Sequence, residues 1–269
     1  FAAQLSLVPV TYPVYVNGVQ YQDAENPVLN YNGRTYIPLA KIADLLNTKY
    51  LWNESAKQVE IGSATPAVET PWTIEQLKAA ENNNKLIVVL GQAGPEAKIY
   101  AYEKTDGVWN KTLMTDGFVG RNGISSSKAE GDGETPAGLY SLSTAFGTAP
   151  DPGSIIPYTQ LTKDDFWVDD VNSKYYNQWA KGYVSDKDWT SAEDLSSETV
   201  AYKYSMLIEY NTNPIVKGKG SAIFLHCSTG RATAGCVSVP EDKMVELLKF
   251  IDKDTKIIIA QAVRDLVKF

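Results

Sequence analysis

The sequence predicts a mainly β protein of the α+β class, in which a small α+β module precedes a larger, β-rich domain. Three observations lead to this prediction. Two Asn-Gly pairs near the amino terminus are typical of hairpin turns, a proline-rich stretch without periodicity follows them, and most of the remaining chain alternates apolar runs with turn residues. A length of 269 residues is sufficient for two such parts.

The module is expected at residues 1–63. Asn17-Gly18 and Asn32-Gly33 tolerate the positive φ angles of a type I′ turn. Strand-like residues lie beside these turns and near the end of the module, at 14–16, 35–38 and 58–61. Apolar residues at helical spacing predict one short helix, formed around Leu39, Ile42, Leu45 and Leu46.

Residues 64–72, rich in proline and small side chains, predict a semi-extended linker to a domain at 73–269. That domain is expected to begin with a short helix around 73–81. Five apolar runs predict its strands, at 86–90, 97–102, 138–142, 206–210 and 222–226. A second helix is predicted by the spacing of Met244, Leu247, Leu248 and Ile251, and a last strand by residues 256–260.

An aromatic-rich stretch at residues 164–189 has no clean period. We interpret it as an ordered excursion rather than a core strand. Long ordered loops on a β scaffold often form one wall of a binding cleft. The alternative is that the aromatic side chains only fix an insertion to the surface.

Composition indicates an ordinary globular chain, with 43% hydrophobic and 21% charged residues. The net charge of −7 opposes binding to phosphate backbones, so no nucleic-acid partner is expected. The apolar runs are far shorter than the roughly 20 residues of a membrane-spanning helix, so no membrane span is expected. A start without an initiator Met fits a trimmed export signal or a truncated chain.

His226, the only histidine, follows an apolar run and precedes Cys236, one of two cysteines. The nearby helix start and an imidazole partner would both favour the thiolate form of Cys236, and Gly235 lets backbone N–H groups approach an oxyanion. Alternatives are a structural histidine and a disulfide between Cys227 and Cys236. A metal site is not expected. One histidine and two cysteines supply at most three soft ligands, and Cys227 should point away from its neighbour His226. No cofactor is expected.

Two segments resemble the L,D-transpeptidase catalytic-domain family. In that family a strand-end histidine precedes a [Ser/Thr]-x-Gly-Cys segment, which Thr233-Ala234-Gly235-Cys236 matches here. Upstream, residues 132–138 are similar to the family's D-x-x-T-P-x-G segment. The resemblance covers about residues 84–260. The sequence departs from the common pattern by Ala234 in place of a second histidine, by Ser238 in place of Arg or Asn, and by a short His-to-Cys spacing.

The resemblance implies a peptidoglycan L,D-transpeptidase without a cofactor. Its Cys236 would form a thioester with a stem tetrapeptide, with His226 as the base, and transfer it to an amine acceptor in cell-wall cross-linking that affects cell shape. Backbone N–H groups of Gly235 and Cys236 are candidates for the oxyanion hole, and Tyr210 is a weaker one. A backbone carbonyl or Ser228 would orient the imidazole. Arg231 and Thr233 are candidate stem-peptide contacts, although a solvated arginine is equally compatible with the loop.

Two other interpretations stay open: an L,D-carboxypeptidase acting on the same bond, and a wall-binding protein whose catalytic centre has decayed. Glu130 and Asp132 lie in a charged, glycine-rich turn, which we favour over an acid/base role.

The N-terminal module is similar to the copper-amine-oxidase N-terminal-like domain, on the residues around Asn17-Gly18, Asn32-Gly33 and Trp52-Asn53. The resemblance implies an accessory module of an exported, cell-wall-associated protein of a Gram-positive bacterium. It does not imply copper, because residues 1–70 contain neither His nor Cys.

Overall fold

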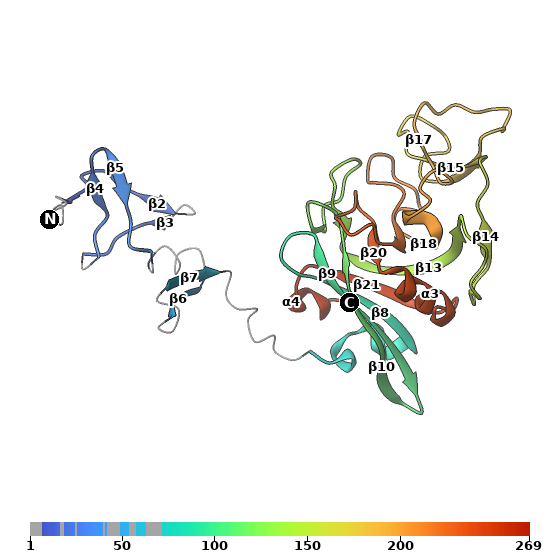
Figure 1. Ribbon diagram of the computed structural model, residues 1–269, viewed down its shortest axis with the longest axis horizontal. Helices are drawn as coiled ribbons and strands as arrows, with labels where there is room; N and C mark the ends of the chain where they lie inside the picture. The colour runs from blue at the N-terminus through green and yellow to red at the C-terminus, as the bar shows by residue number, and fades with distance from the viewer. Residues whose placement is uncertain are drawn as a thin grey trace. The chain divides into compact units, whose positions relative to one another are not determined.

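The computed structural model describes residues 7–16, 19–24, 26–39, 41, 49–53, 58–62 and 72–269. The chain divides into two compact units, Phe1–Pro71 and Trp72–Phe269, each of which is described by itself (Figure 1). The linker expected at 64–72 lies almost entirely outside the described residues, so the domain limits stay predictions.

The first unit contains short strands: β1 (Val8–Pro9), β2 (Tyr15–Val16), β3 (Val19–Gln20), β4 (Leu29–Tyr31), β5 (Arg34–Tyr36), β6 (Lys49–Asn53) and β7 (Gln58–Gly62). They pair antiparallel as β1-β4-β5, β2-β3 and β6-β7. The turn between β4 and β5 is confirmed, since Asn32 and Gly33 have φ angles of 49° and 76°. The Asn17-Gly18 pair and most of the helix expected from Leu39 to Leu46 lie outside the described residues.

The second unit is mainly β, as predicted, and is built on a sheet of nine strands: β8 (Lys85–Gly91), β9 (Glu96–Thr105), β10 (Val108–Phe118), β13 (Gly138–Gly147), β14 (Tyr158–Gln160), β18 (Ser205–Ile208), β19 (Phe224–Cys227), β20 (Val237–Val239) and β21 (Lys256–Ala260). Their order is β14-β13-β18-β19-β20-β10-β9-β8-β21, and β13 also pairs with β21. The sheet therefore closes on itself, which protects strand edges from pairing with other chains. Each of the apolar runs expected to be a strand overlaps one of these nine.

One face of this sheet forms the main core together with α3 (Glu241–Phe250). The helix is confirmed at the expected place, with Met244, Leu247 and Leu248 fully buried. The helix expected at 73–81 is instead two short pieces, η1 (Ile74–Gln76) and α2 (Ala79–Asn82), because Leu77 between them has extended backbone angles. These two pieces and α4 (Val263–Leu266) cover the outer face of β8 and β21.

The aromatic-rich stretch contributes to a second sheet of three strands in the order β16-β15-β17: β15 (Asp165–Val168), β16 (Trp179–Lys181) and β17 (Ala192–Asp194). Strands this short leave no readable period in the sequence, which is why none was predicted here. Figure 1 shows β15 and β17 at the upper end of the larger unit. Trp167 packs edge-on against Phe224 of β19, with ring centroids 5.1 Å apart, so the small sheet covers the outer face of β19.

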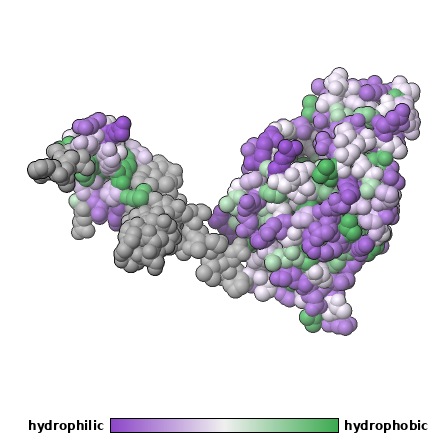
Figure 2. Space-filling view, in the orientation of Figure 1, coloured by the Kyte–Doolittle hydropathy of each residue, from purple (hydrophilic) through white to green (hydrophobic). Residues whose placement is uncertain are grey.

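The face of the larger unit seen in Figure 2 is mostly hydrophilic, with scattered hydrophobic side chains. In the part of the chain that the structure describes, no helix is long and apolar enough to cross a membrane.

Candidate active site

The sheet register brings His226 and Cys236 to the same face. β19 and β20 run parallel with Leu225 opposite Val237 and His226 opposite Ser238. Leu225 and Val237 point into the main core. Because side chains alternate along a strand, His226 and Cys236 project on the opposite face, beneath the three-stranded sheet.

His226 is held in one tautomer by the backbone. It is 7% exposed, and its Nδ1 lies 2.8 Å from the carbonyl oxygen of Cys227. A carbonyl only accepts hydrogen bonds, so Nδ1 carries the proton and Nε2 keeps a free lone pair. Burial lowers the pKa of His226 to about 4, against the opposing effect of the bond to Cys227. His226 is therefore a neutral imidazole oriented by a carbonyl, and Ser228 does not orient it.

Cys236 is a buried, protonated thiol. It is 7% exposed, its Sγ accepts a hydrogen bond from the Phe224 N–H at 3.3 Å, and the thiol donates to the Ala222 carbonyl at 3.3 Å. Burial raises the pKa of Cys236, the negative charge of Glu193 raises it further, and Lys128 lowers it by less. The expectation that its surroundings favour the thiolate is wrong for this state. β20 and Pro240 separate Cys236 from the start of α3.

The two cysteines are both free, so the alternative of a disulfide is wrong for this structure. Cys227 points into the main core, whereas Cys236 packs with Phe224 and Tyr202 on the other face. The Cys227 thiol donates to the Tyr204 carbonyl at 3.5 Å. Among the described residues, no group of three or more His, Cys, Asp and Glu side chains is arranged to hold a metal ion.

Two threonines hold the backbone of the segment around Cys236. Thr233 Oγ1 donates to the Cys236 carbonyl at 2.7 Å, and Thr135 Oγ1 donates to the same oxygen at 3.3 Å. Thr135 also accepts from the Gly120 N–H at 2.8 Å, and Thr233 from the Gly235 N–H at 3.1 Å. The Gly235 amide is thus engaged within the loop, which leaves the Cys236 amide as the stronger candidate for the oxyanion hole.

A side chain at Gly235 would be crowded by its neighbours. A Cβ atom there would lie 3.0 Å from the Glu134 carbonyl oxygen and 3.1 Å from Ile223 Cδ1. The upstream segment therefore packs directly on the loop that ends at Cys236. Its short strand β12 (Thr135–Pro136) pairs in parallel with β11 (Ile124–Ser125), which fixes Thr135 in place.

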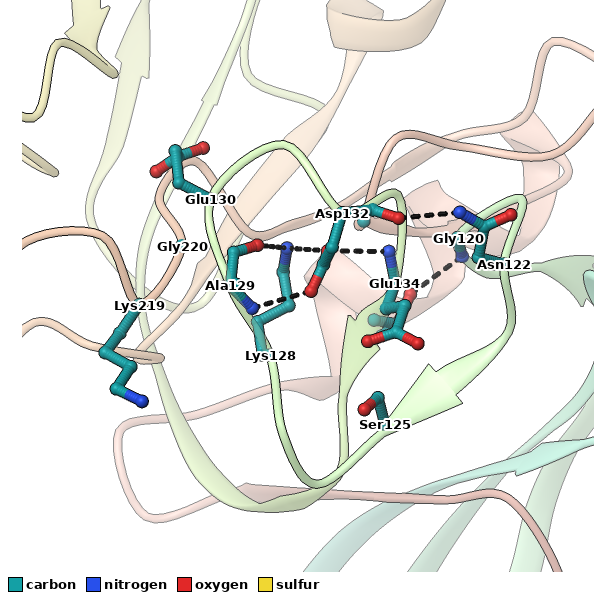
Figure 3. A network of polar contacts seen from close by, with 12 residues as sticks. Gly120, Asn122, Ser125, Lys128, Ala129, Glu130, Asp132, Glu134, Lys219 and Gly220 are labelled. Carbon is teal, nitrogen blue, oxygen red and sulfur yellow. Dashed lines mark hydrogen bonds and ion pairs between the residues drawn. The ribbon is translucent and has the colours of Figure 1, made fainter.

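Asp132 shapes the turn beside this segment, as Figure 3 shows. Its carboxylate accepts from the Lys128 ammonium at 2.5 Å and from the N–H groups of Ala129 and Glu134 at 2.6 and 2.9 Å. The nearby Glu130 carboxylate accepts from the hydroxyls of Tyr176 and Ser221. These are the contacts of residues that stabilise a turn and attach it to the aromatic stretch.

The other residues expected at the site lie in varied surroundings. The Tyr210 hydroxyl donates to the Lys219 carbonyl, so it is not available as an oxyanion donor in this state. Ser228 Oγ accepts from the Gly230 N–H at 3.0 Å and shapes the loop after His226. Arg231 is exposed, and no ion pair involves it within the described ranges. A role for Arg231 in binding substrate stays a prediction.

Sequence reasoning missed Tyr202 and Glu193. Tyr202, in η2 (Ala201–Lys203), packs edge-on against His226 with ring centroids 5.6 Å apart, and its hydroxyl donates to Glu193 Oε2 at 2.9 Å. Burial raises the pKa of Glu193 to about 7, the bond from Tyr202 opposes this, and Asp169 adds to the increase. Glu193 lies in a polar stretch that resembles a solvated loop, so no pattern in the sequence marks it as a site residue.

Two protein families match the chain. The L,D-transpeptidase catalytic domain family (YkuD) matches residues 87–259, and the copper amine oxidase N-terminal domain family matches residues 15–95. No curated protein shows significant similarity to the chain.

Several solved structures are similar to parts of the chain. They include Bd1075 of Bdellovibrio bacteriovorus (14% identity, TM-score 0.37, covering 71% of this chain and 55% of that chain). An L,D-transpeptidase of Stackebrandtia nassauensis has 12% identity and a TM-score of 0.33, covering 71% of this chain and 62% of that chain. L,D-transpeptidase 1 of Mycobacterium tuberculosis has 10% identity and a TM-score of 0.28, covering 65% and 62%. The chain thus spans less than two thirds of the length of each of these three.

The substitution Glu193→Gln should remove a pH-dependent loss of stability. The folded-state pKa of Glu193, about 7, lies above its ordinary value, so the stability that its protonated form contributes is present below about pH 4.5 and is lost as the pH rises through 7. We expect the free energy of unfolding of Glu193→Gln, relative to that of the wild type, to be higher at about pH 8 than at about pH 5. The difference should be on the order of 1 to 3 kcal/mol, measured by thermal unfolding. Glu81→Gln, at an exposed side chain of α2, is the control and should follow the wild type. Equal pH dependence of wild type and Glu193→Gln would contradict this account.

Replacing Thr135 by Val should destabilise the segment around Cys236. The change leaves the buried Gly120 N–H without its acceptor and removes one of two donors to the Cys236 carbonyl. We expect a loss of about 1 to 3 kcal/mol in the free energy of unfolding, measured by urea denaturation. Thr135→Ser keeps the hydroxyl, so its free energy of unfolding should fall by less than half as much as that of Thr135→Val. Equal losses in the two variants would show that the hydrogen bonds of the hydroxyl contribute nothing and that only packing matters.

Proposed function

Because this chain belongs to the L,D-transpeptidase catalytic-domain family, we propose that it forms a thioester between Cys236 and a peptidoglycan stem tetrapeptide and transfers the acyl group to an amine. The observation that carries the proposal is the fixed tautomer of His226. Its Nδ1–H is committed to the Cys227 carbonyl, so the free Nε2 is the atom that can take a proton, on the face of the sheet that also holds Cys236.

In the first half of the reaction, Nε2 of His226 removes the thiol proton as Sγ of Cys236 bonds to the substrate carbonyl carbon. The imidazolium then gives this proton to the leaving D-alanine amine as the C–N bond breaks. In the second half, Nε2 takes a proton from the acceptor amine as its nitrogen attacks the thioester. The Cys236 sulfur leaves and recovers the proton from His226, which restores the neutral pair.

The electrostatics of the resting site favour proton transfer that accompanies attack. Burial lowers the pKa of His226 and raises that of Cys236, so a preformed thiolate–imidazolium pair is disfavoured. The developing negative charge on the substrate oxygen needs a donor, and the Cys236 N–H is our candidate. Thr135 and Thr233 hold the carbonyl of the same residue, which fixes the backbone at this position.

The side chains that pack over Cys236 support transfer of the acyl group to an amine rather than to water. Cys236 is 7% exposed and packs in one cluster with Trp167, Leu195 and Tyr202 from the segment that includes the small sheet. Excluding water from the acyl-enzyme is what allows aminolysis to compete with hydrolysis. An L,D-carboxypeptidase would be the outcome if water entered freely.

We further propose that the protein acts outside the cytoplasm, at the wall of a Gram-positive bacterium, with the first unit as a stalk or wall-binding accessory. The match of the copper amine oxidase N-terminal domain family to residues 15–95 and the wall chemistry of the catalytic family support this. Copper binding is not proposed, because residues 1–70 lack His and Cys. Arg231, exposed in the loop before Cys236, is proposed to pair with a carboxylate of the stem peptide.

The proposal is tested by intact mass spectrometry after incubation with a carbapenem, a reagent that acylates a nucleophile of this class. The wild type should gain one adduct, and Cys236→Ala should gain none. Cys227→Ala is the matched control, because it removes the other thiol from the opposite face of the sheet and should keep the adduct. Absence of an adduct on folded, reduced wild type would contradict the proposal and favour a wall-binding protein.

Product analysis then separates the two reactions. With a stem tetrapeptide and an added amine acceptor, a transpeptidase yields the cross-linked product, whereas a carboxypeptidase yields only the tripeptide and free D-alanine.

A further inference from the structure

A row of polar side chains crosses three adjacent strands at His226. Ser205 of β18 lies opposite His226 on one side, and Ser238 of β20 lies opposite it on the other. Residues directly opposite on neighbouring strands point to the same face, and in the antiparallel pair β18–β19 their Cβ atoms are about 4.5 to 5.5 Å apart. The next strands place Phe146 beside Ser205 and Phe118 beside Ser238, so the polar row has apolar ends.

Both serines are buried and unsatisfied. Ser205 is 0% and Ser238 is 1% exposed, and neither hydroxyl oxygen has a hydrogen-bond partner among the residues that the structure describes. Native proteins pair nearly all buried polar groups, so an unpaired hydroxyl beside a reactive group indicates a partner that forms in another state. Ser238 stands two residues after Cys236 on the same face of its strand.

The reaction creates a hydrogen-bond donor at this place. When His226 takes the thiol proton, its Nε2 gains an N–H, whereas Nδ1–H already donates to the Cys227 carbonyl. Once the sulfur of Cys236 is bound in a thioester it is a poor acceptor. To act as the base, Nε2 would have to face β20, the strand that follows Cys236 and carries Ser238 opposite His226.

Few charged groups are available to stabilise the imidazolium instead. On η2 and α3, which pack against β19, the Tyr202 hydroxyl is engaged by Glu193, Lys203 pairs with Glu241 at 2.6 Å, and Lys243 pairs with Glu246 at 2.6 Å. The other charged side chains of α3, Asp242 and Lys249, are exposed, and the Cys236 thiol lies on the same face of the sheet as His226. Burial lowers the pKa of His226 to about 4, which shows that its charged form is poorly solvated. A neutral acceptor beside Nε2 would reduce this penalty during the reaction.

We propose that Ser238 is a positioning residue whose hydroxyl accepts the Nε2–H of the His226 imidazolium during acyl transfer. This inference rests on the proposed function, because it assigns Ser238 a part in the same proton transfer. Ser205, on the opposite side of the ring, provides a matched comparison with the same burial and the same unpaired hydroxyl.

The direct test uses the single histidine of the chain as a probe. NMR titration of the His226 ring resonances in the full chain needs no assignment among several histidines. The Cys236→Ala background removes the thiol as a competing acceptor. In this background, Ser238→Ala should lower the His226 midpoint by about one unit, a tenfold loss of proton affinity. Ser205→Ala should leave it unchanged, and Ser238→Thr should restore it.

A second measurement covers the case in which acid unfolds the protein before His226 titrates. The rate of carbapenem acylation between about pH 6 and pH 9, with Cys236 present, should fall about tenfold in Ser238→Ala and recover in Ser238→Thr, while Ser205→Ala retains the wild-type rate. Equal effects of the two alanine substitutions, or none for Ser238→Ala, would overturn the inference. The titration measures the pKa of His226 and requires no turnover, so it tests the role of Ser238 alone. The proposed function is tested separately, and it fails if the wild type forms no adduct.

Discussion

Parallel pairing of β19 with β20, in the register that sets His226 beside Ser238, is the constraint on which the site depends. A shift of one residue would send the side chain of Cys236 into the main core and separate it from His226. The pairing is secured on both sides, because β18 continues the sheet beyond β19 and β10 continues it beyond β20. Closure through β13 and β21 then holds the whole sheet together.

Burial of His226 and Cys236 determines their protonation states. A single backbone carbonyl fixes the tautomer of His226, and aromatic side chains packed over the site shield His226 and Cys236 from water. Desolvation favours the uncharged form of each side chain. In the resting protein the Cys236 thiol is therefore protonated and the His226 imidazole is neutral. Neutral hydroxyl and amide groups, rather than ion pairs, are then the means of stabilising charge when it develops.

Much of the second unit could be predicted from the sequence. Continuous apolar runs predicted strands such as β8 and β21, and apolar residues at helical spacing predicted the helix α3. His226 and Cys236 were recognisable from residue type and from family resemblance. The carbonyl that orients the imidazole was one of two alternatives, and only coordinates could decide between them.

The rest depends on contacts between segments far apart in the chain. Thr135 was visible within a family segment, yet its bond to the Cys236 carbonyl joins residues 101 positions apart. Glu193 and Tyr202 reach the site from a stretch whose short strands have no period. The sign of the Cys236 pKa shift was predicted wrongly, because proximity to a helix start and to a histidine says nothing about how deeply the thiol is buried.

In the resting protein, burial keeps Cys236 a neutral thiol and His226 a neutral imidazole on the same face of the sheet. The most direct measurement is the ultraviolet thiolate absorbance near 240 nm, recorded as the difference between wild type and Cys236→Ala across about pH 5 to pH 9. The account predicts no thiolate signal from Cys236 over this range, because burial raises its pKa. A thiolate band at neutral pH that disappears in Cys236→Ala would contradict it and establish a preformed ion pair.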